Sequence, residues 1–124
     1  DVYTPINLLL GQVINPFSSE LRNLSADPYD DVLMEAFCSY IEKSQKRLQK
    51  VSHIYQSMPT PTSAKSFGLD LYYCFSQVQD GLNELERYTM GYVDSYLHDG
   101  RQMLNEAKRK RSHLKEKRRK LRVS

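Results

Sequence analysis

The chain has 124 residues, of which 40% are hydrophobic and 27% charged, a length and composition typical of one soluble globular domain. Its apolar content excludes a fully disordered chain, and its longest apolar run is far shorter than the roughly 20 residues that span a bilayer. Residues 101–124 hold 11 Lys or Arg and 2 Asp or Glu, a net charge of +9, whereas residues 1–100 hold 7 and 13, a net charge of −6. A mildly acidic body therefore carries a strongly basic C-terminal segment.

The N-terminal region contains two helix-start signals. Thr4-Pro5 places a capping residue before a proline at the first helical position, which predicts a helix over residues 6–14. Asn15-Pro16 is expected to end this helix because the residue before proline disfavours helical geometry. Residues 16–26 are mixed: Phe17, Leu21 and Leu24 are spaced for a turn or two of helix, whereas the serines and Asn23 favour a loop. Asp27-Pro28 repeats the start signal and predicts a second helix.

A long helical pattern follows. Neither Pro nor Gly interrupts residues 29–58, and apolar or small residues recur there at alternating steps of three and four. The polar stretch over residues 42–46 predicts a bend between two helices. Residues 59–63, with the sequence Pro-Thr-Pro-Thr-Ser, predict a linker whose Ser63 caps the next helix.

The last third has a second helical pattern that glycines interrupt. Gly81, Gly91 and Gly100 each disfavour a helix interior by about 1 kcal/mol relative to Ala, so two or three short helices are expected. Large apolar residues become sparse after Ala107. We therefore expect a helical domain over residues 1–115 and a flexible basic tail over residues 116–124. No alternating strand pattern occurs, so the fold is predicted to be all-α.

The two helical patterns also predict which side chains are buried in a core or a dimer interface. The tyrosines of the last third either cover a small core or form a partly wet contact between copies of the chain. The expected core or dimer residues are Phe37, Ile41, Leu48, Val51, Tyr55, Phe75, Val78, Leu82, Leu85 and Tyr92.

Residues capable of chemistry are scattered. The three histidines lie far apart, no serine has a His and an acid placed around it, and no Gly-rich phosphate loop occurs. Cys38 and Cys74 lack the spacing of a zinc site, and they either form one disulfide or remain two buried thiols. Asn23-Leu24-Ser25 is an N-glycosylation sequon. We expect no enzymatic activity, no metal and no cofactor.

The basic segment is the strongest functional signal. Two tetrabasic blocks attract polyanions through counterion release, and nucleic acid, heparan sulfate, an anionic membrane and a nuclear-import receptor are all candidate partners. The alternative is a solvated helix end that charge keeps soluble. The candidate polyanion-binding residues are Lys108, Arg109, Lys110, Arg111, Lys117, Arg118, Arg119 and Lys120.

The order of these features resembles the interferon gamma (type II interferon) family. Lys108-Arg109-Lys110-Arg111-Ser112 is similar to the family's C-terminal basic motif. Tyr40-Ile41-Glu42-Lys43-Ser44-Gln45-Lys46-Arg47-Leu48, followed by Val51-Ser52 and Tyr55, is similar to its central helix. Asp80-Gly81-Leu82 and residues 97–106 find counterparts in its later helices. The resemblance covers roughly residues 28–112.

The resemblance implies a six-helix cytokine bundle that forms an intertwined, two-fold homodimer. The helices would lie near residues 5–14, 28–40, 44–58, 63–78, 80–88 and 91–115. The protein would be secreted to the extracellular space and would cluster cell-surface receptor chains to trigger antiviral and immune signalling. Its basic tail would bind heparan sulfate, no nucleic acid would be involved, and Asn23 would carry a glycan. The implied receptor-binding residues are Ile6, Leu9, Leu10, Gln12, Val13, Phe17, Glu20, Asn105 and Glu106.

Two departures from the family pattern are visible. Tyr40 stands where the family has tryptophan, and the polar spacer before the basic block is missing. Since Ala107 is followed directly by Lys108, the first tetrabasic block is predicted to lie on the last helix itself. The alternative hypothesis is an intracellular helical coiled-coil interaction protein with a basic nuclear-localisation or nucleic-acid-binding tail.

Overall fold

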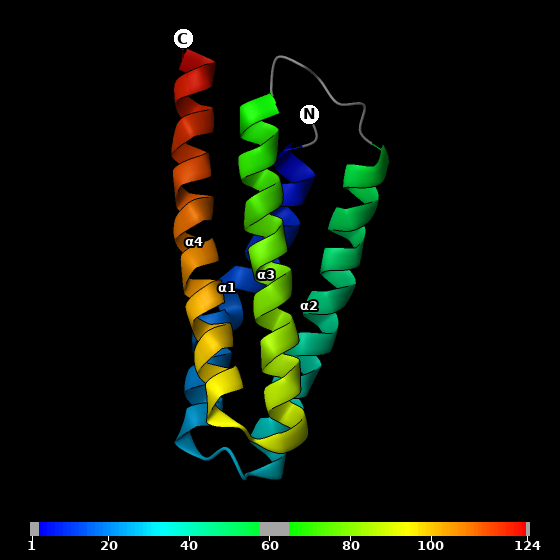
Figure 1. The fold of residues 1–124 in the computed structure, drawn as a ribbon, viewed down its shortest axis with the longest axis vertical. Helices are drawn as coiled ribbons and strands as arrows, with labels where there is room; N and C mark the ends of the chain where they lie inside the picture. The colour runs from blue at the N-terminus through cyan, green and yellow to red at the C-terminus, as the bar shows by residue number, and fades with distance from the viewer. Residues whose placement is uncertain (1–2, 58–64, 124) are drawn as a thin grey trace.

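The computed structural model describes residues 3–57 and 65–123, which form four helices and, within those ranges, no strand. Helix α1 spans Tyr3–Ala26, α2 spans Asp31–Ser57, α3 spans Lys65–Gly91 and α4 spans Asp94–Val123. Consecutive helices run antiparallel in one elongated bundle (Figure 1). The all-α prediction is confirmed, and the predicted count of six helices is wrong. The predicted linker at residues 59–63 lies outside the described residues.

Helix α1 continues through the position where a break was expected. Pro16 lies inside α1, and the mixed stretch after residue 15 is helical as far as Ala26. Proline removes one backbone hydrogen bond and disfavours a helix interior by about 3 kcal/mol. Burial on both sides of the proline offsets this penalty, because apolar side chains recur at helical spacing along the whole of α1 and are almost fully buried. They are Ile6, Leu10, Val13, Ile14, Phe17, Leu21 and Leu24.

Helix α2 begins at Asp31, three residues after Pro28, and Asp30 caps it. The backbone N–H groups of Val32 and Leu33 donate to Asp30 Oδ1 over 2.9 and 3.1 Å. This is the geometry of an N-cap, which satisfies helix donors that lack an internal partner. The expected bend at residues 42–46 is absent, because Ser44 is fully buried and continues the inward-facing stripe between Ile41 and Leu48.

Helices α3 and α4 approach closely at two of the glycines that were expected to break them. A Cβ atom added to Gly100 would lie 2.7 Å from Leu85 Cδ2 and 3.0 Å from the Gly81 carbonyl oxygen. A Cβ atom added to Gly81 would lie 3.1 Å from Leu104 Cγ. These glycines therefore permit close packing of two continuous helices, and the prediction that they divide the region into shorter helices is wrong.

The basic segment belongs to α4, which runs as a helix to Val123. The boundary proposed between residues 115 and 116 does not coincide with a helix end. Leu114 is the last residue of α4 in the buried core, and the side chains described beyond it are exposed. The prediction that the first tetrabasic block lies on the last helix agrees with this arrangement.

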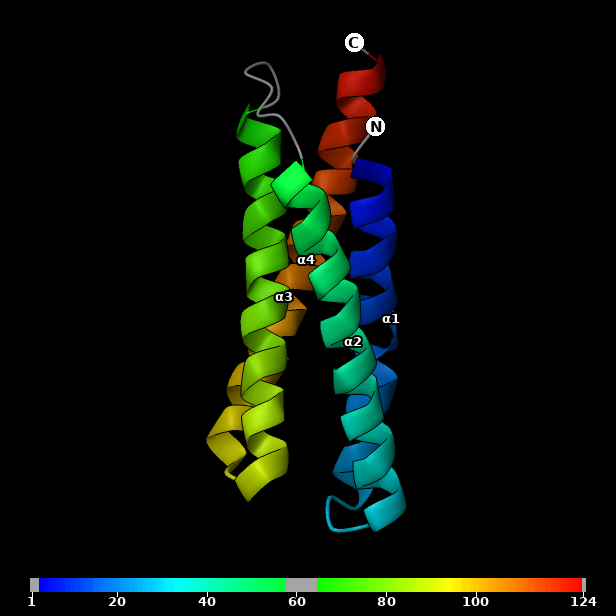
Figure 2. The same ribbon diagram turned by 90° about the vertical axis from the view of Figure 1, so that its right-hand side faces the viewer.

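The bundle consists of two antiparallel helix pairs that pack face to face. Helix α1 packs mainly on α2, and α4 packs mainly on α3, with α2 and α3 forming the larger of the contacts between the pairs (Figure 2). The interior is one continuous apolar cluster that draws on all four helices. The structure contains one copy of the chain, so the intertwined dimer stays a prediction.

Candidate functional site

The residues that were expected to bind a receptor do not lie on one common surface. Four of the α1 residues, Ile6, Leu10, Val13 and Phe17, have at most 1% of their surface exposed. Leu9 and Glu20 are half-buried, and Gln12 is exposed. On α4, Asn105 is exposed, and Glu106 accepts a 2.6 Å hydrogen bond from Gln77. The apolar α1 positions therefore build the core, because their spacing of three and four residues places them on its inward face.

Nine of the ten residues expected in a core or dimer interface lie in or against the core of the single chain. Phe37, Ile41, Leu48, Val51, Phe75, Val78, Leu82 and Leu85 are buried, and Tyr55 packs against them while half-buried. Tyr92 lies outside the core of the single chain, because it is in the turn between α3 and α4, and 41% of its surface is exposed. Its expected place in a dimer interface stays a prediction.

The cysteines and the sequon residue lie in different environments. Cys38 is an exposed free thiol on α2, whereas Cys74 is a buried free thiol on α3, so no disulfide joins them. The Cys74 thiol donates to the Ala107 carbonyl over 3.5 Å. Asn23 is exposed on α1.

The predicted polyanion-binding residues divide into paired and unpaired groups. Lys117 pairs with Asp70 at 3.0 Å and Arg119 pairs with Glu116 at 2.6 Å. Lys108, Arg109, Lys110 and Lys120 are exposed and form no ion pair with another described residue. The Arg118 side chain lies outside the described part of the chain. Arg111 differs from the others because it is half-buried and points towards α1.

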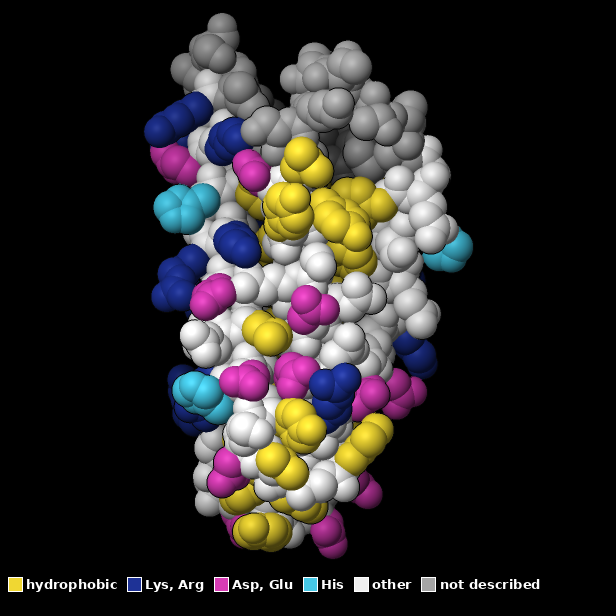
Figure 3. Space-filling view, viewed as in Figure 1, with side chains coloured by type: hydrophobic (Ala, Val, Ile, Leu, Met, Phe, Trp, Pro, Cys, Tyr) yellow, Lys and Arg dark blue, Asp and Glu magenta, His cyan; other side chains and the backbone are white. Residues whose placement is uncertain are grey.

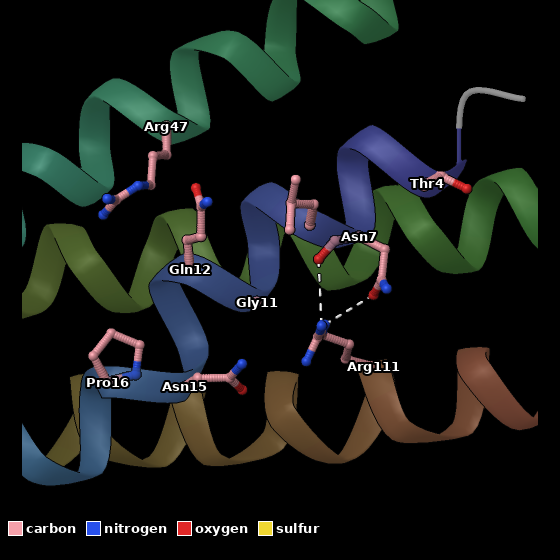
Figure 4. Close-up of a pocket in the computed structure, with 9 residues that line it drawn as sticks. Thr4, Asn7, Gly11, Gln12, Asn15, Pro16, Arg47 and Arg111 are labelled. Atoms are coloured by element: carbon pink, nitrogen blue, oxygen red, sulfur yellow. Dashed lines mark hydrogen bonds between the residues drawn. The ribbon is translucent and has the colours of Figure 1, made fainter.

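Arg111 borders an open groove of about 550 Å³ on the outer side of α1, which we call the α1 groove (Figure 4). Its Nε donates to Asn7 Oδ1 over 2.9 Å, and its Nη2 donates to the Asn7 carbonyl over 3.3 Å. Helix α2 contributes Arg47 from the other side. The groove is lined by Thr4, Asn7, Leu8, Gly11, Gln12, Asn15, Pro16, Arg47 and Arg111.

A second surface feature lies at the end of the bundle where the α1–α2 and α3–α4 turns meet. Hydrophobic side chains gather there on the surface (Figure 3). Large apolar residues on these turns are 41–77% exposed, and the Tyr29 and Tyr92 rings join the two turns with centroids 5.4 Å apart. We call this set the end patch: Tyr29, Val32, Met90, Tyr92 and Val93.

The backbone of the end patch is strained at Tyr92. This residue has φ = 58°, and its N–H donates to the Tyr88 carbonyl over 2.8 Å, closing the C-terminus of α3. Glycine ordinarily occupies this left-handed position, and another L-residue there costs about 1–2 kcal/mol. The Tyr92 ring in turn packs edge-on against Tyr88, with centroids 5.8 Å apart. An exposed aromatic side chain is thus held on a strained backbone conformation. Strained backbone conformations are concentrated at functional sites.

Acidic residues flank the end patch in the sequence. Residues 23–42 and 88–100 contain seven Asp or Glu and no Lys or Arg. Asp31 and Asp94 are exposed, and each is adjacent in sequence to an apolar member of the patch. The negative charge found in the first hundred residues is therefore partly gathered at this end, whereas the basic half of α4 extends towards the opposite end (Figure 1).

Of the end patch, the sequence pattern singled out only Tyr92, which was expected in a core or a dimer interface. The sequence signal for the patch is that Tyr29, Met90 and Val93 lie next to helix-ending residues. A side chain at a turn does not follow the helical periodicity that buries neighbouring residues. In the described part of the chain, no three His, Cys, Asp or Glu residues are grouped so as to hold a metal ion. No described helix is long and apolar enough to cross a membrane.

A comparison with protein families gives one match. The model of the cyanobacterial DnaJ chaperone C-terminal domain matches residues 1–122, nearly the whole chain. No curated protein and no solved structure matches this chain.

The family match corrects the functional part of the sequence interpretation. The resemblance to interferon gamma is wrong, and so are the cytokine function, the secretion, the receptor and heparan sulfate partners and the immune role that it implied. The glycan expected at Asn23 as part of a secreted cytokine loses its basis. The alternative of a coiled-coil protein with a nuclear or nucleic-acid-binding tail is not supported by the match either. The short basic and central-helix motifs reflected helical spacing and charge, which unrelated helical proteins share. The chain belongs to the family of cyanobacterial DnaJ chaperone C-terminal domains.

Proposed function

We propose that this chain is a non-catalytic, helical module of a DnaJ-type chaperone that binds polypeptides in non-native states. The family match over residues 1–122 carries this proposal. Proteins that have not completed folding expose apolar surface, and a holding chaperone binds such states in preference to the native one. A chaperone module of this kind needs an exposed apolar surface that does not collapse into its own core.

The end patch supplies such a surface. Val32 and Met90 are about three-quarters exposed, and the unbranched methionine side chain adapts to ligands of varied shape. Tyr29 and Tyr92 provide large aromatic surfaces with polar tips, a combination enriched in protein interfaces. The exposed carboxylates of Asp31 and Asp94, next to Val32 and Val93, favour segments that combine apolar residues with Lys or Arg, because opposite charges steer association and discriminate between partners.

The absence of catalysis is part of the same proposal. His53, His98 and His113 are exposed and come from different helices or different turns of α4.

The buried tyrosine Tyr40 donates from its hydroxyl to the Val13 carbonyl over 2.7 Å, and burial raises its pKa above the ordinary range. That tyrosine therefore stays neutral and supports packing of α1 on α2.

The test is a direct binding measurement with the full chain. The probe is a fluorescently labelled model protein that has been reduced and carboxymethylated so that it stays unfolded, and anisotropy reports its binding. The wild-type chain is expected to bind this probe and not the native, disulfide-bonded form. The double substitution Val32→Ser and Met90→Ser should weaken binding at least tenfold, since it removes apolar area from the patch while leaving the core intact.

The matched control is Leu69→Ser. Leu69 is half-exposed on α3, near the opposite end of the bundle, and lies outside the end patch. This substitution should change the affinity less than twofold, and circular dichroism should show the same helix content in all variants. If the wild-type chain does not bind the unfolded probe, or if the control weakens binding as much as the double substitution, the proposal is wrong.

A further inference from the structure

Opposite charges lie towards opposite ends of this bundle. The end patch belongs to two segments, residues 23–42 and 88–100, that contain seven Asp or Glu and no Lys or Arg, whereas residues 101–124 have a net charge of +9. The turns that carry the patch lie at one end of the bundle, and the C-terminus of α4 lies at the other (Figure 1). Asp94 and Lys115 are about 32 Å apart along α4, several times the Debye length of about 8 Å at physiological ionic strength. The two regions therefore do not neutralise each other within one molecule.

The acidic region places carboxylates without ion pairs beside the end patch. Asp31 and Asp94 are exposed, and neither forms an ion pair with another described residue. Asp94 is close enough to act on the patch, because burial raises the pKa of the Tyr88 hydroxyl and the negative charge of Asp94 raises it further. The Tyr88 ring contacts that of Tyr92, with centroids 5.8 Å apart. Exposed apolar surface is thus combined with uncompensated negative charge.

The basic region presents a row of cations on the outer side of α4. Lys108 and Lys115 are seven residues apart, which is two helical turns. Arg109 and Lys120 are eleven apart, which is three turns, so each pair lines one side of the helix. This side is opposite the buried Leu104, Ala107 and Leu114. Four exposed residues that form no ion pair with a described residue make up what we call the α4 basic face: Lys108, Arg109, Lys115 and Lys120.

Lysine and arginine side chains suit both components of the acidic end. Their charged groups attract carboxylates, their methylene stems cover apolar surface, and they bind over the faces of tyrosine rings. The end patch offers the exposed rings of Tyr29 and Tyr92. A second copy of the chain therefore presents a surface of complementary charge to each of the two regions.

We propose that copies of this chain associate head to tail, with the end patch and the carboxylates of Asp31 and Asp94 in one copy bound to the α4 basic face of the next. The two surfaces of this contact differ, so every copy keeps one of each available and assemblies lengthen as the protein concentration rises. In a two-fold dimer, by contrast, both copies use the same surface. The contact does not depend on polypeptide binding.

Sedimentation velocity of the full chain, without any polypeptide probe, tests the association. At low ionic strength the mean mass should exceed that of one chain and should rise with protein concentration. At about 1 M salt, where the Debye length falls to about 3 Å, the chain should sediment as a single copy. A single copy at every concentration at low ionic strength would overturn the proposal. Association that nuclease treatment abolishes would also overturn it, because nucleic acid would then bridge the copies.

Charge reversal identifies the two surfaces. An acidic-side variant combines Asp31→Lys and Asp94→Lys, and a basic-side variant combines Lys108→Glu and Arg109→Glu. Each variant alone should associate at least tenfold more weakly than the wild type, since the charges in the contact no longer complement each other. An equimolar mixture should restore association, because the unaltered α4 of the acidic-side variant meets the unaltered end of the basic-side variant.

The matched control for the basic-side variant combines Lys43→Glu and Lys50→Glu on α2. Both lysines are exposed, and these substitutions change the net charge by the same amount away from α4. The control should alter association less than twofold, and circular dichroism should show the same helix content in all variants. An equal loss in the control, or a mixture that stays as single copies, would refute the head-to-tail contact. Either result leaves the polypeptide-binding proposal standing, because no polypeptide is present.

Discussion

The two cysteines show how position alters the chemistry of the same residue type. Cys38 is exposed on α2, whereas Cys74 is fully buried on α3 and donates to the Ala107 carbonyl of α4. Desolvation by burial raises the pKa of the Cys74 thiol from 9.0 to about 11, although Arg111 and Lys110 favour the thiolate. Because the thiolate is the reactive form, Cys74 is protected both by its burial and by its protonation.

We predict that a thiol-specific reagent modifies Cys38 rapidly and Cys74 only when the bundle opens. Raising the pKa from 9.0 to about 11 lowers the thiolate fraction near neutral pH about 100-fold, before any effect of access. The measurement is the time course of thiol modification at pH 7.5 in native and denaturing conditions. Cys38→Ser should abolish the fast phase and leave the slow one. A fast phase that survives in this variant would contradict the burial of Cys74.

At the scale of elements, the packing of α3 on α4 depends on two glycines. Gly81 and Gly100 face each other across the contact, and each would place an added Cβ atom within 3.3 Å of atoms on the other helix. Gly91, at the end of α3, meets only Val93 Cγ2 at 3.9 Å. Glycine thus allows close helix packing at two positions, whereas its surroundings are open at the third.

We predict that Gly100→Ala lowers the free energy of unfolding by about 1–3 kcal/mol, because overpacking against Leu85 and the Gly81 backbone exceeds the gain in helix propensity. Gly91→Ala is the matched control and should leave the free energy unchanged or raise it by up to about 1 kcal/mol. Urea denaturation followed by circular dichroism measures both. Equal stabilisation by the two substitutions would show that α3 and α4 are farther apart at Gly100 than the structure places them.

For the whole molecule, charge and burial vary along the length of the bundle. The turns at one end carry the end patch and its carboxylates, while the second half of α4 is basic and extends towards the other end. Burial along α4 continues only to Leu114, whose exposed fraction is 4%. Beyond this residue the described side chains are exposed, and Lys117 pairs with Asp70 of α3 on the surface.

We predict that deleting residues 116–124 leaves the bundle folded, with a change in the free energy of unfolding below about 1 kcal/mol, because surface ion pairs contribute little. Deleting residues 108–124 should destabilise it by about 2–4 kcal/mol, since that change also removes the buried Leu114 and the Arg111 hydrogen bonds to Asn7. Thermal unfolding of the two truncated chains makes the comparison. Equal stability of both would mean that α4 contributes nothing beyond Ala107.

The family resemblance inferred from sequence failed for a physical reason. Basic blocks and an aromatic-acidic-basic sequence on a helix describe solvated helix surfaces, and such surfaces are under few packing constraints. The predicted receptor-binding residues were wrong for a different reason. Ile6, Leu10, Val13 and Phe17 recur at the helical spacing that places apolar side chains in the core. Neither the end patch nor the α1 groove follows from periodicity, since each is assembled from residues on separate helices or turns.

The sequence by itself determined the all-α class, most of the core and the charge asymmetry, because helical periodicity and composition are local properties. Only the tertiary structure decided that Pro16, the polar stretch around Ser44, Gly81 and Gly100 do not end helices. Local propensities of about 1–3 kcal/mol favoured breaks at the proline and the glycines, but the burial of apolar side chains along each helix outweighs them. Tertiary packing also decided that Arg111 crosses to Asn7 and that Tyr29 meets Tyr92, because these pairs are separated by 104 and 63 residues and meet only when the helices pack.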